Sequence, residues 1–504
     1  MIRRPALTAA SAAAVAVALL PLVYLGVRAA EAGPDRIVAE LFTARVAVLA
    51  GRSLALAAVV TAACTVLGVA TGLLVARTDL PARRAVGLLA ALPLAVPTYV
   101  AGFAWTATVT GFEGFWAAAL LLTLCSYPYV FLPTVAALHR ADPGQEEVSR
   151  SLGRGPWATL FGVTLRQIRP AVAAGALLVA LYVLSDFGAV SIVRVDTFTR
   201  AIFTAFNLGF DRTGALVLST VLVLLSVLLI GGELSTRTRD ARYASGTTRP
   251  PVRLRLARWR GPALLGVLAV SGLALGVPAA GLARWLAAGV SRPGSLAEVA
   301  TAAGASLSVS LAGAALSMLL ALPLGLLTAR APGRVATALD RLTYVAHALP
   351  GVVIGLSLVF FAVNVVYPLY QSVWLLALAY ATLFLPLAVG AVASAAAQSP
   401  PAVEEAARSL GRGPFTVFRT VTLPLTLPGI GAGAALTFLT CMKELPATLL
   451  LRPTGMDTLA TELWTHTNSS AYAAAAPYAA ILVALAAVPT WLLAVRTGLT
   501  GGAR

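Results

Sequence analysis

Residues 146–156 read EEVSRSLGRGP, and residues 404–414 read EEAARSLGRGP. The similarity reaches beyond these stretches, because residues 142–194 align with residues 400–452 without a gap and share 21 of 53 residues. In both copies the polar stretch stands between two long apolar runs. We therefore predict a chain of two halves built on one plan, each with a polar loop of this sequence.

The composition excludes an ordinary soluble globule. Of the 504 residues, 59% are hydrophobic and 11% are charged, whereas a soluble domain carries about a quarter charged residues. The net charge of +17 comes almost entirely from arginines in short segments between apolar runs. Such charges set the orientation of a membrane protein, so we expect a polytopic, all-α membrane protein with no nucleic-acid partner.

Twelve apolar segments have the length of a membrane span, about 20 residues. With the N-terminus on the inside, the inner segments hold 26 arginines and the outer segments hold 10. This bias agrees with the positive-inside rule and predicts cytoplasmic N- and C-termini in the inner membrane. The expected spans are 6–27, 53–76, 86–110, 114–138, 170–193, 214–232, 262–283, 306–329, 343–366, 372–397, 428–450 and 473–495.

Six spans in each half place both halves the same way up, which is a parallel repeat. We expect the repeats to be residues 1–232 and 262–504, joined by a basic cytoplasmic linker at 233–261 that is solvated or faces lipid headgroups. Residues 1–30 are compatible with a signal peptide. Their apolar stretch is long for that purpose, so we expect an uncleaved first span.

The second copy of the loop resembles the EAA loop of bacterial ABC-importer permeases. In that family the pattern is E-A-A, three residues, G, nine residues and I-x-L-P, and here only Val421 departs from it. The first copy is degenerate, with Val148 and Ser149 for the two alanines and Arg166 for the proline. The expected loop residues are Glu146, Glu147 and Gly153 in the first copy, and Glu404, Glu405, Ala406, Ala407, Gly411, Leu423 and Pro424 in the second.

The resemblance implies the type I ABC-importer permease fold, with each loop forming a short helix that seats in a groove of an ATP-binding subunit. A nucleotide-binding P-loop needs a lysine within G-x-x-x-x-G-K-[ST], and the single lysine here, Lys443, is followed by Glu444. We therefore expect no catalytic residue and no cofactor in this chain. ATP and Mg²⁺ are expected on two separate ATP-binding subunits, and a substrate-binding protein is expected on the outer side.

Two further stretches resemble fused permeases of the ferric-iron type, and this resemblance covers nearly the whole chain. They are LSDFGAVSIVRVDTFTRAIFTAFN from Leu184 and KELPATLLLRPTGMDTLATELW from Lys443. The resemblance implies import of ferric iron, free or chelated, with thiamine, polyamines and oxyanions as alternatives. An ion-coupled secondary transporter is a different class, which the EAA-like loops disfavour. A non-transporting scaffold would give no role to acids inside the spans.

Asp186 and Glu444 are such acids, at aligned positions in the fifth and eleventh spans. A charge at the bilayer centre costs roughly 2.5–3.5 kcal/mol on insertion scales, so it normally faces a cavity or a partner. Gly188 and Pro446 follow the acids and predict broken helices that face a translocation path. We expect Asp186, Lys443 and Glu444 to line this path. Iron ligation by the carboxylates and a purely structural role remain alternatives.

No metal site is predicted. The three cysteines lie in apolar segments and form no CxxC pair. The histidines are scattered along the sequence: His139, His347 and His466.

Overall fold

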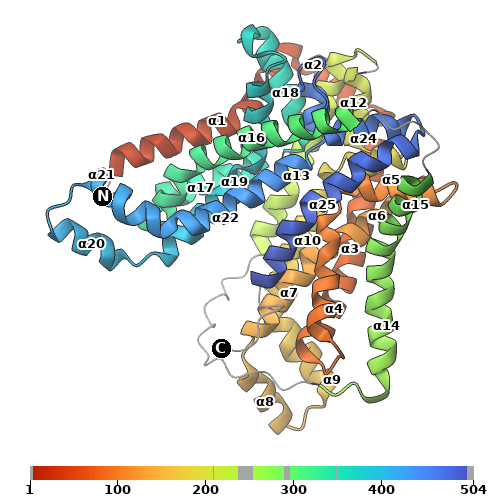
Figure 1. Cartoon of the computed structure of the whole chain (residues 1–504), viewed down its shortest axis with the longest axis vertical. Helices are drawn as coiled ribbons and strands as arrows, with labels where there is room; N and C mark the ends of the chain where they lie inside the picture. Colours follow the sequence, from red (N-terminus) through yellow and green to blue (C-terminus); the bar gives the residue numbers. More distant parts are fainter. Residues whose placement is uncertain (1–3, 208, 237–253, 289–295, 348, 497–504) are drawn as a thin grey trace. The chain divides into compact units, whose positions relative to one another are not determined.

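The computed structural model describes residues 4–207, 209–236, 254–288, 296–347 and 349–496 (Figure 1). Within these residues the regular elements are helices, and the only β pairing is an isolated parallel bridge between Thr78 and Leu254. The all-α prediction is therefore confirmed. The helices pack into two compact units, and each unit draws on three separate segments of the chain.

The first unit is made of Met1–Thr43, Ala201–Val223 and Pro293–Thr465. Three of its helices, α12, α13 and α24, run past its limits into segments of the second unit. Its helices are α1 (Arg4–Ala32), α2 (Pro34–Leu41), α12 (Phe198–Asn207), α13 (Arg212–Thr236), α16 (Leu296–Arg330), α17 (Arg334–His347), α18 (Gly351–Asn364), η5 (Tyr367–Leu369), α19 (Val373–Gln398), α20 (Pro401–Ser409), α21 (Pro414–Val417), η6 (Phe418–Thr422), α22 (Leu423–Met442), α23 (Pro446–Leu451) and α24 (Leu459–Asn468).

The second unit is made of Ala44–Arg200, Leu224–Arg292 and His466–Arg504. Its helices are α3 (Ala44–Arg77), α4 (Arg83–Ala91), η1 (Leu92–Ala95), α5 (Thr98–Thr108), α6 (Phe115–Ser126), α7 (Pro128–Arg140), α8 (Pro143–Ser151), α9 (Pro156–Thr159), η2 (Leu160–Thr164), α10 (Leu165–Ser185), α11 (Gly188–Ile192), η3 (Ala257–Trp259), α14 (Arg260–Ser271), η4 (Gly272–Gly276), α15 (Val277–Ala288) and α25 (Tyr472–Arg496).

The helices account for the expected spans. Among the described residues, nine helices are long and apolar enough to cross a membrane. The pair Arg83–Ala95 and Thr98–Thr108 is also apolar enough, but it is bent by 93° and forms either one broken span or a re-entrant loop. Two shorter apolar helices, Gly351–Asn364 and Tyr472–Ala487, lie where the ninth and twelfth spans are expected.

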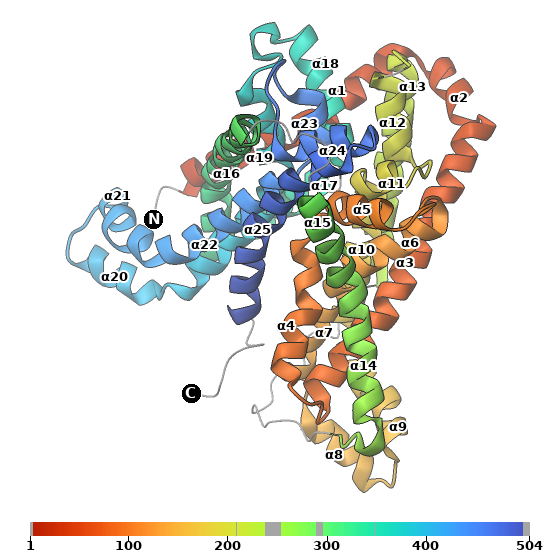
Figure 2. The same cartoon turned by 45° about the vertical axis from the view of Figure 1, so that its right-hand side comes forward.

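The compact units do not coincide with the two halves of the sequence. Helix α1 belongs to the first half, yet it packs against α16, α18 and α19 of the second half (Figure 2). Its Val15 and Ala18 join a core that includes Ala321 and Leu385. Conversely, α15 packs against α5 of the first half. The first span of each half therefore completes the core built by the other half.

Small residues bring the second and fourth spans of each half into close contact, as is usual where membrane helices meet. A Cβ atom added to Gly72 would lie 2.7 Å from Thr134 Cγ2, and one added to Gly325 would lie 2.6 Å from Val392 Cβ. In the register that aligns Arg77 with Arg330, these two glycines stand at the same position. The repeat in the sequence therefore extends to the packing of each unit.

Candidate functional site

The two repeated stretches form two loops of the same construction, each at one end of its unit (Figure 1). The first loop (residues 142–164) contains α8, and the second loop (residues 400–422) contains α20. Each helix has a proline in its first turn, where the missing N–H costs nothing. In the first loop, Asp142 Oδ1 also accepts a hydrogen bond from Gly144 N–H at 2.9 Å.

Both helices end at the predicted glycine. Gly153 and Gly411 have φ values of +77° and +79°, in the left-handed region that glycine enters at little cost. Arg154 N–H donates to Ser149 O at 3.2 Å, and Arg412 N–H donates to Ala407 O at 3.2 Å. This is the Schellman hydrogen-bond pattern, and it turns the chain out of the helix at the same point in both loops.

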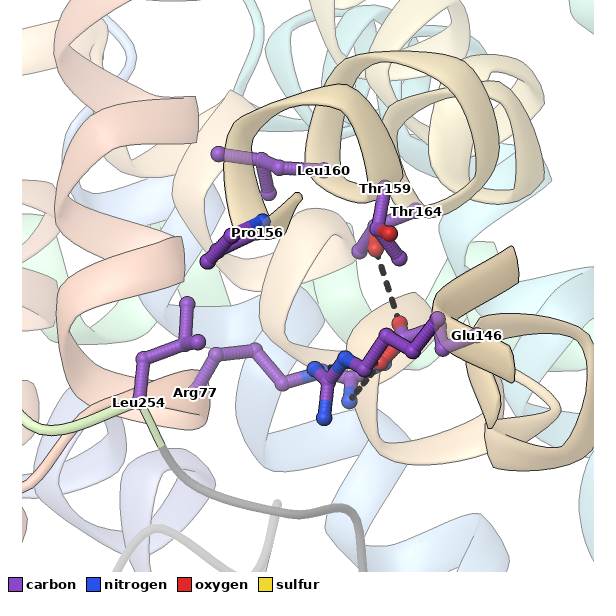
Figure 3. A pocket seen from close by; sticks show the side chains of 8 residues that line it. Arg77, Glu146, Pro156, Thr159, Leu160, Thr164 and Leu254 are labelled. Atoms are coloured by element: carbon purple, nitrogen blue, oxygen red, sulfur yellow. Dashed lines mark hydrogen bonds and ion pairs between the residues drawn. The ribbon is translucent and has the colours of Figure 1, made fainter. Parts of the chain in front are cut away.

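The first acid of the first loop is buried in an ion pair (Figure 3). Glu146 Oε1 lies 2.9 Å from Arg77 Nη2, and both side chains are less than a tenth exposed. Glu146 Oε1 also accepts a hydrogen bond from Thr164 Oγ1 at 2.8 Å. Arg77 is the last residue of α3, so this pair fastens α8 to the end of the second span.

The second loop repeats this contact with a different partner set. Arg330 Nη2, at the end of α16, lies 2.7 Å from Glu404 Oε1, at ion-pair distance but without the alignment of a hydrogen bond. It donates a hydrogen bond to Ser399 O at 3.1 Å. Arg408 Nη2 donates to Glu404 Oε2 at 3.0 Å. In both loops, therefore, the first acid holds the loop to its own unit.

The second acid of each pair points outward instead. Glu147 and Glu405 are exposed, as is Ala406, while Ala407 is half-buried. Large apolar side chains are exposed beside them, although burial of such groups is strongly favoured. These side chains are Val148, Leu152, Trp157 and Phe161 in the first loop, and Val403, Leu410 and Phe415 in the second. An acid among exposed apolar groups is suited to binding the surface of another protein.

Each loop ends in one turn of π-helix, Leu160–Thr164 and Phe418–Thr422, at aligned positions. Such π-bulges are frequent at functional sites, and here each leads into the fifth span of its half. The predicted residues Leu423 and Pro424 begin α22 directly after the second π-turn. Pro424 is exposed and stands just after the π-turn, within the continuous helix Phe415–Met442.

Asp186 and Glu444 lie at the far ends of these spans. Helix α10 ends at Ser185 and α22 ends at Met442, so the predicted breaks beside the acids are present. Because α10 has 21 residues, about 30 Å separates the loop from the acid along the helix axis. The structure therefore does not bring the two groups of predicted site residues together.

Both carboxylates are buried and bind backbone N–H groups of the short helix that follows. Asp186 Oδ2 accepts from Ala189 N–H at 2.9 Å, and its Oδ1 accepts from Thr98 Oγ1 at 2.6 Å. Glu444 Oε1 accepts from Ala447 N–H at 3.1 Å, and its Oε2 accepts from Thr448 N–H at 3.1 Å. The acids thus fix the direction in which the chain continues after the break.

The neighbouring groups show how closely the third and fifth spans approach here. Pro97 and Pro350 cap α5 and α18 with nearly the same backbone angles. A Cβ atom added to Gly351 would lie 2.4 Å from Glu444 Oε1.

Lys443, the third residue predicted for the path, is half-buried, and its backbone N–H donates to Thr440 O at 3.2 Å. Within the described part of the chain, no three His, Cys, Asp or Glu side chains are grouped to hold a metal ion.

Comparison with known proteins decides the family. The sequence profile of the family described as "Binding-protein-dependent transport system inner membrane component" matches residues 65–233 and again residues 321–495. The chain belongs to this family. It is a multi-pass inner-membrane permease subunit in which the family domain is present twice, and such subunits are non-catalytic components that work with a substrate-binding protein and an ATPase.

Three curated relatives are permease proteins of transport systems. The chain is 38% identical over 479 residues to the Fe(3+)-transport system permease protein FbpB 2 of Haemophilus influenzae, covering 94% of this chain and 95% of that protein. It is 27% identical over 202 residues to the sulfate transport system permease protein CysT of Escherichia coli, covering 36% and 73%. It is 46% identical over 72 residues to the molybdenum transport system permease protein ModB of Escherichia coli, covering 14% and 31%.

The sequence reasoning missed the partners of the predicted acids. Arg77 and Arg330 align when the two halves are superposed in sequence, so their pairing with the loop acids could have been found from that match. Thr98 carried no such signal, because it follows a proline in the third span and is distant in sequence from Asp186.

Proposed function

We propose that this chain imports ferric iron, free or chelated, across the inner membrane. Two separate ATP-binding subunits, which bind ATP and Mg²⁺, drive the transport by docking on the first and second loops. The N- and C-termini then lie in the cytoplasm together with both loops. A substrate-binding protein delivers the iron from the opposite side.

The observation that carries this proposal is the pair of matched loops. Each loop presents an exposed acid and several exposed apolar side chains, while its other acid is buried and paired with an arginine at the end of the second span. A force applied to the exposed side of α8 or α20 therefore reaches two spans. It reaches the second span through the ion pair and the fifth span through the π-turn.

Iron is the substrate favoured by the similarity to the Fe(3+)-transport permease, which extends over 94% of this chain. The sulfate and molybdenum permeases match over much smaller parts of the chain. We propose no direct ligation of iron by Asp186 or Glu444, since backbone N–H groups occupy both carboxylates. We propose that these acids shape the path by holding the broken fifth spans open at their ends, with Lys443 beside Glu444.

Uptake in a deletion strain tests the substrate. Cells that lack the chromosomal copy and carry this chain on a plasmid should recover uptake of radiolabelled ferric iron, but not of thiamine, spermidine or sulfate. A chain with a defective second loop serves as the control for expression. Recovery of thiamine or polyamine uptake without iron uptake would show that iron is not the substrate. It would leave the proposed docking of ATP-binding subunits on the two loops intact.

The orientation has its own test. Alkaline phosphatase fused after residue 496 should be inactive, and green fluorescent protein fused there should fluoresce, because only the cytoplasm supports the second reporter. The reverse pattern would place both loops on the outside and rule out docking of ATP-binding subunits on them.

A further inference from the structure

The linker between the two halves ends in a segment that is bound to the first half. This segment is Leu254–Arg260, the part of the predicted linker before α14 that the structure describes; residues 237–253 lie outside the described residues. Leu254 N–H donates to Arg77 O at 2.8 Å, and Asp79 N–H donates to Leu254 O at 3.2 Å. The segment is therefore hydrogen-bonded to the turn after α3, a contact that the sequence did not predict, while most of its residues stay exposed.

One side chain holds this segment at two points. Asp79 Oδ1 accepts a hydrogen bond from Leu256 N–H at 2.8 Å, and Asp79 Oδ2 accepts one from Arg260 Nε at 3.1 Å. Hydrogen bonds to a charged acceptor are stronger than bonds between neutral groups. Asp79 is therefore the residue whose removal would release the segment most completely.

The bound segment lies beside the ion pair of the first loop. Leu254 lines the same small cavity as Arg77, Glu146 and Thr164 (Figure 3), and the cavity volume of about 20 Å³ leaves room for roughly one water molecule. The Arg77 side chain is 4% exposed, whereas its counterpart Arg330 is 19% exposed. Excluding water strengthens the attraction between the two charges, so Leu254 contributes to holding Glu146 in place.

We call the contacts between Asp79 and Leu254–Arg260 the clamp. The second half has no equivalent of this clamp in its sequence. When Arg77 is aligned with Arg330, Ala331 and Pro332 stand where Thr78 and Asp79 stand. Neither residue offers a carboxylate, and proline has no N–H to donate to a bridging segment. The clamp therefore belongs to the half whose loop departs from the EAA pattern.

We propose that Leu254–Arg260 is a positioning element of the first loop, fixed there by Asp79. The proposal rests on the proposed function, because it concerns the loop on which an ATP-binding subunit docks. By lining one wall of the cavity beside Arg77, the segment keeps Glu146 paired and α8 in its docking position. The linker thus does more than join the halves, since it compensates the degenerate loop for the contacts that the EAA pattern supplies in the other half.

Loop-specific crosslinking tests this proposal in the assembled transporter. Val148→Cys reports on the first loop and Val403→Cys on the second, because both valines are exposed and the native cysteines are buried. Each variant is crosslinked to the ATP-binding subunit with a thiol-to-amine reagent, with and without Asp79→Ala. We expect Asp79→Ala to lower the yield from position 148 about three- to tenfold, the range expected for losing these polar contacts, and to leave the yield from position 403 unchanged.

Other outcomes would overturn the proposal. Unchanged yields at both positions, or equal losses at both, would mean that the segment does not position the first loop. Arg260→Gln guards against a folding defect, because it keeps the Leu256 hydrogen bond and should give a smaller loss at position 148 alone. If neither cysteine variant crosslinks to the ATP-binding subunit while Asp79 is intact, the proposed docking on the loops is itself wrong. If both variants crosslink but Asp79→Ala does not lower the yield at position 148 selectively, only the role of the linker is overturned.

Discussion

Gly153 and Gly411 decide where α8 and α20 stop, because a side chain is disfavoured at their positive φ angles. A non-glycine residue in the left-handed region costs roughly 1–2 kcal/mol. A Cβ atom at either position meets no other atom within 4 Å, so the cost is one of backbone strain and not of collision. Substitution there should change the direction of the loop without disturbing the core.

We predict that Gly411→Val uncouples ATP hydrolysis from iron uptake. The strained turn should redirect Arg412 and weaken docking by about five- to thirtyfold, the factor that corresponds to the expected strain. Gly413→Ala is the matched control, since Gly413 lacks a positive φ and its added Cβ also meets open space. Normal uptake with wild-type recovery of the ATP-binding subunit in a pull-down would contradict the prediction.

The main role of Asp186 and Glu444 is to accept hydrogen bonds that stabilise the fold, and not to supply charge to the path. We predict that the double variant Asp186→Asn and Glu444→Gln lowers the melting temperature of the purified permease, because each amide offers a weaker acceptor to buried N–H groups. The expected loss is about 1–3 kcal/mol for each site. Asp196→Asn is the control, since Asp196 is 60% exposed. Normal melting with a selective loss of iron uptake would instead place the carboxylates in the path itself.

At the scale of elements, each loop helix uses its two consecutive acids for different tasks. We predict that Glu404→Gln lowers the stability of the permease alone, because Arg330 loses its charged partner in a buried site. Glu405→Gln should leave that stability unchanged and weaken binding of the ATP-binding subunit, because Glu405 is exposed. Thermal unfolding without the ATPase and titration with it separate the two effects. The same phenotype for both variants would refute the division of roles.

The contact between the linker and α3 should respond to salt and not to moderate acid. The Arg260 guanidinium and the Leu256 N–H lower the pKa of Asp79 to about 2, below the ordinary value near 3.9. The contribution of Asp79 is therefore complete above the ordinary value and is lost only as the pH falls toward 2. Salt screens the exposed ion pair. Amide exchange at Leu256 should stay constant, after correction for intrinsic rates, from pH 8 to 5 and should rise in 1 M salt; a loss of protection near pH 6 would point to another group.

The sequence predicted these elements unevenly, and the physical reasons differ. The helix ends at Gly153 and Gly411 and the breaks beside Asp186 and Glu444 were predictable, because glycine, proline and capping acids act locally. The burial of Glu146 and Glu404 was not, because nothing local distinguishes them from the exposed acids that follow. Their partners come from α3 and α16. The hydrogen bonds between the end of the linker and the turn after α3 were not predictable either, because nothing in the arginine-rich linker sequence indicates a partner.

At the scale of the whole molecule, the repeat is visible in the sequence, but the exchange of first spans is not. Apolar periodicity says that a segment enters the membrane; it does not say which helices the segment meets there. The boundaries at residues 232 and 262 describe the duplication, whereas the compact units take α1 from one half and α15 from the other. Packing against a partner that is distant in the sequence decided this part of the fold.

We predict that a change in α1 destabilises helices of the second half. Ala18→Leu should cost about 1–3 kcal/mol through overpacking, because Ala18 is fully buried in the core with Ala321 and Leu385. Hydrogen exchange should speed up in α16 and α19 and stay unchanged in α3 and α7. Val23→Leu is the control, since Val23 is 62% exposed. Faster exchange confined to α3 and α7 would show that α1 supports its own half instead.

The place of α1 in the core also has a consequence for the biosynthesis of this protein. The ribosome releases α1 first, but the helices that enclose it begin only at Leu296, and at about 5–20 residues per second the wait is roughly 10–50 s. During that time α1 has to stand in the lipid without its final neighbours. Its composition allows this, since the segment Pro5–Glu31 has a mean hydropathy of 2.2. A nascent chain interrupted before α16 would therefore leave an orphan helix in the bilayer, available to membrane proteases or to the second half of another copy.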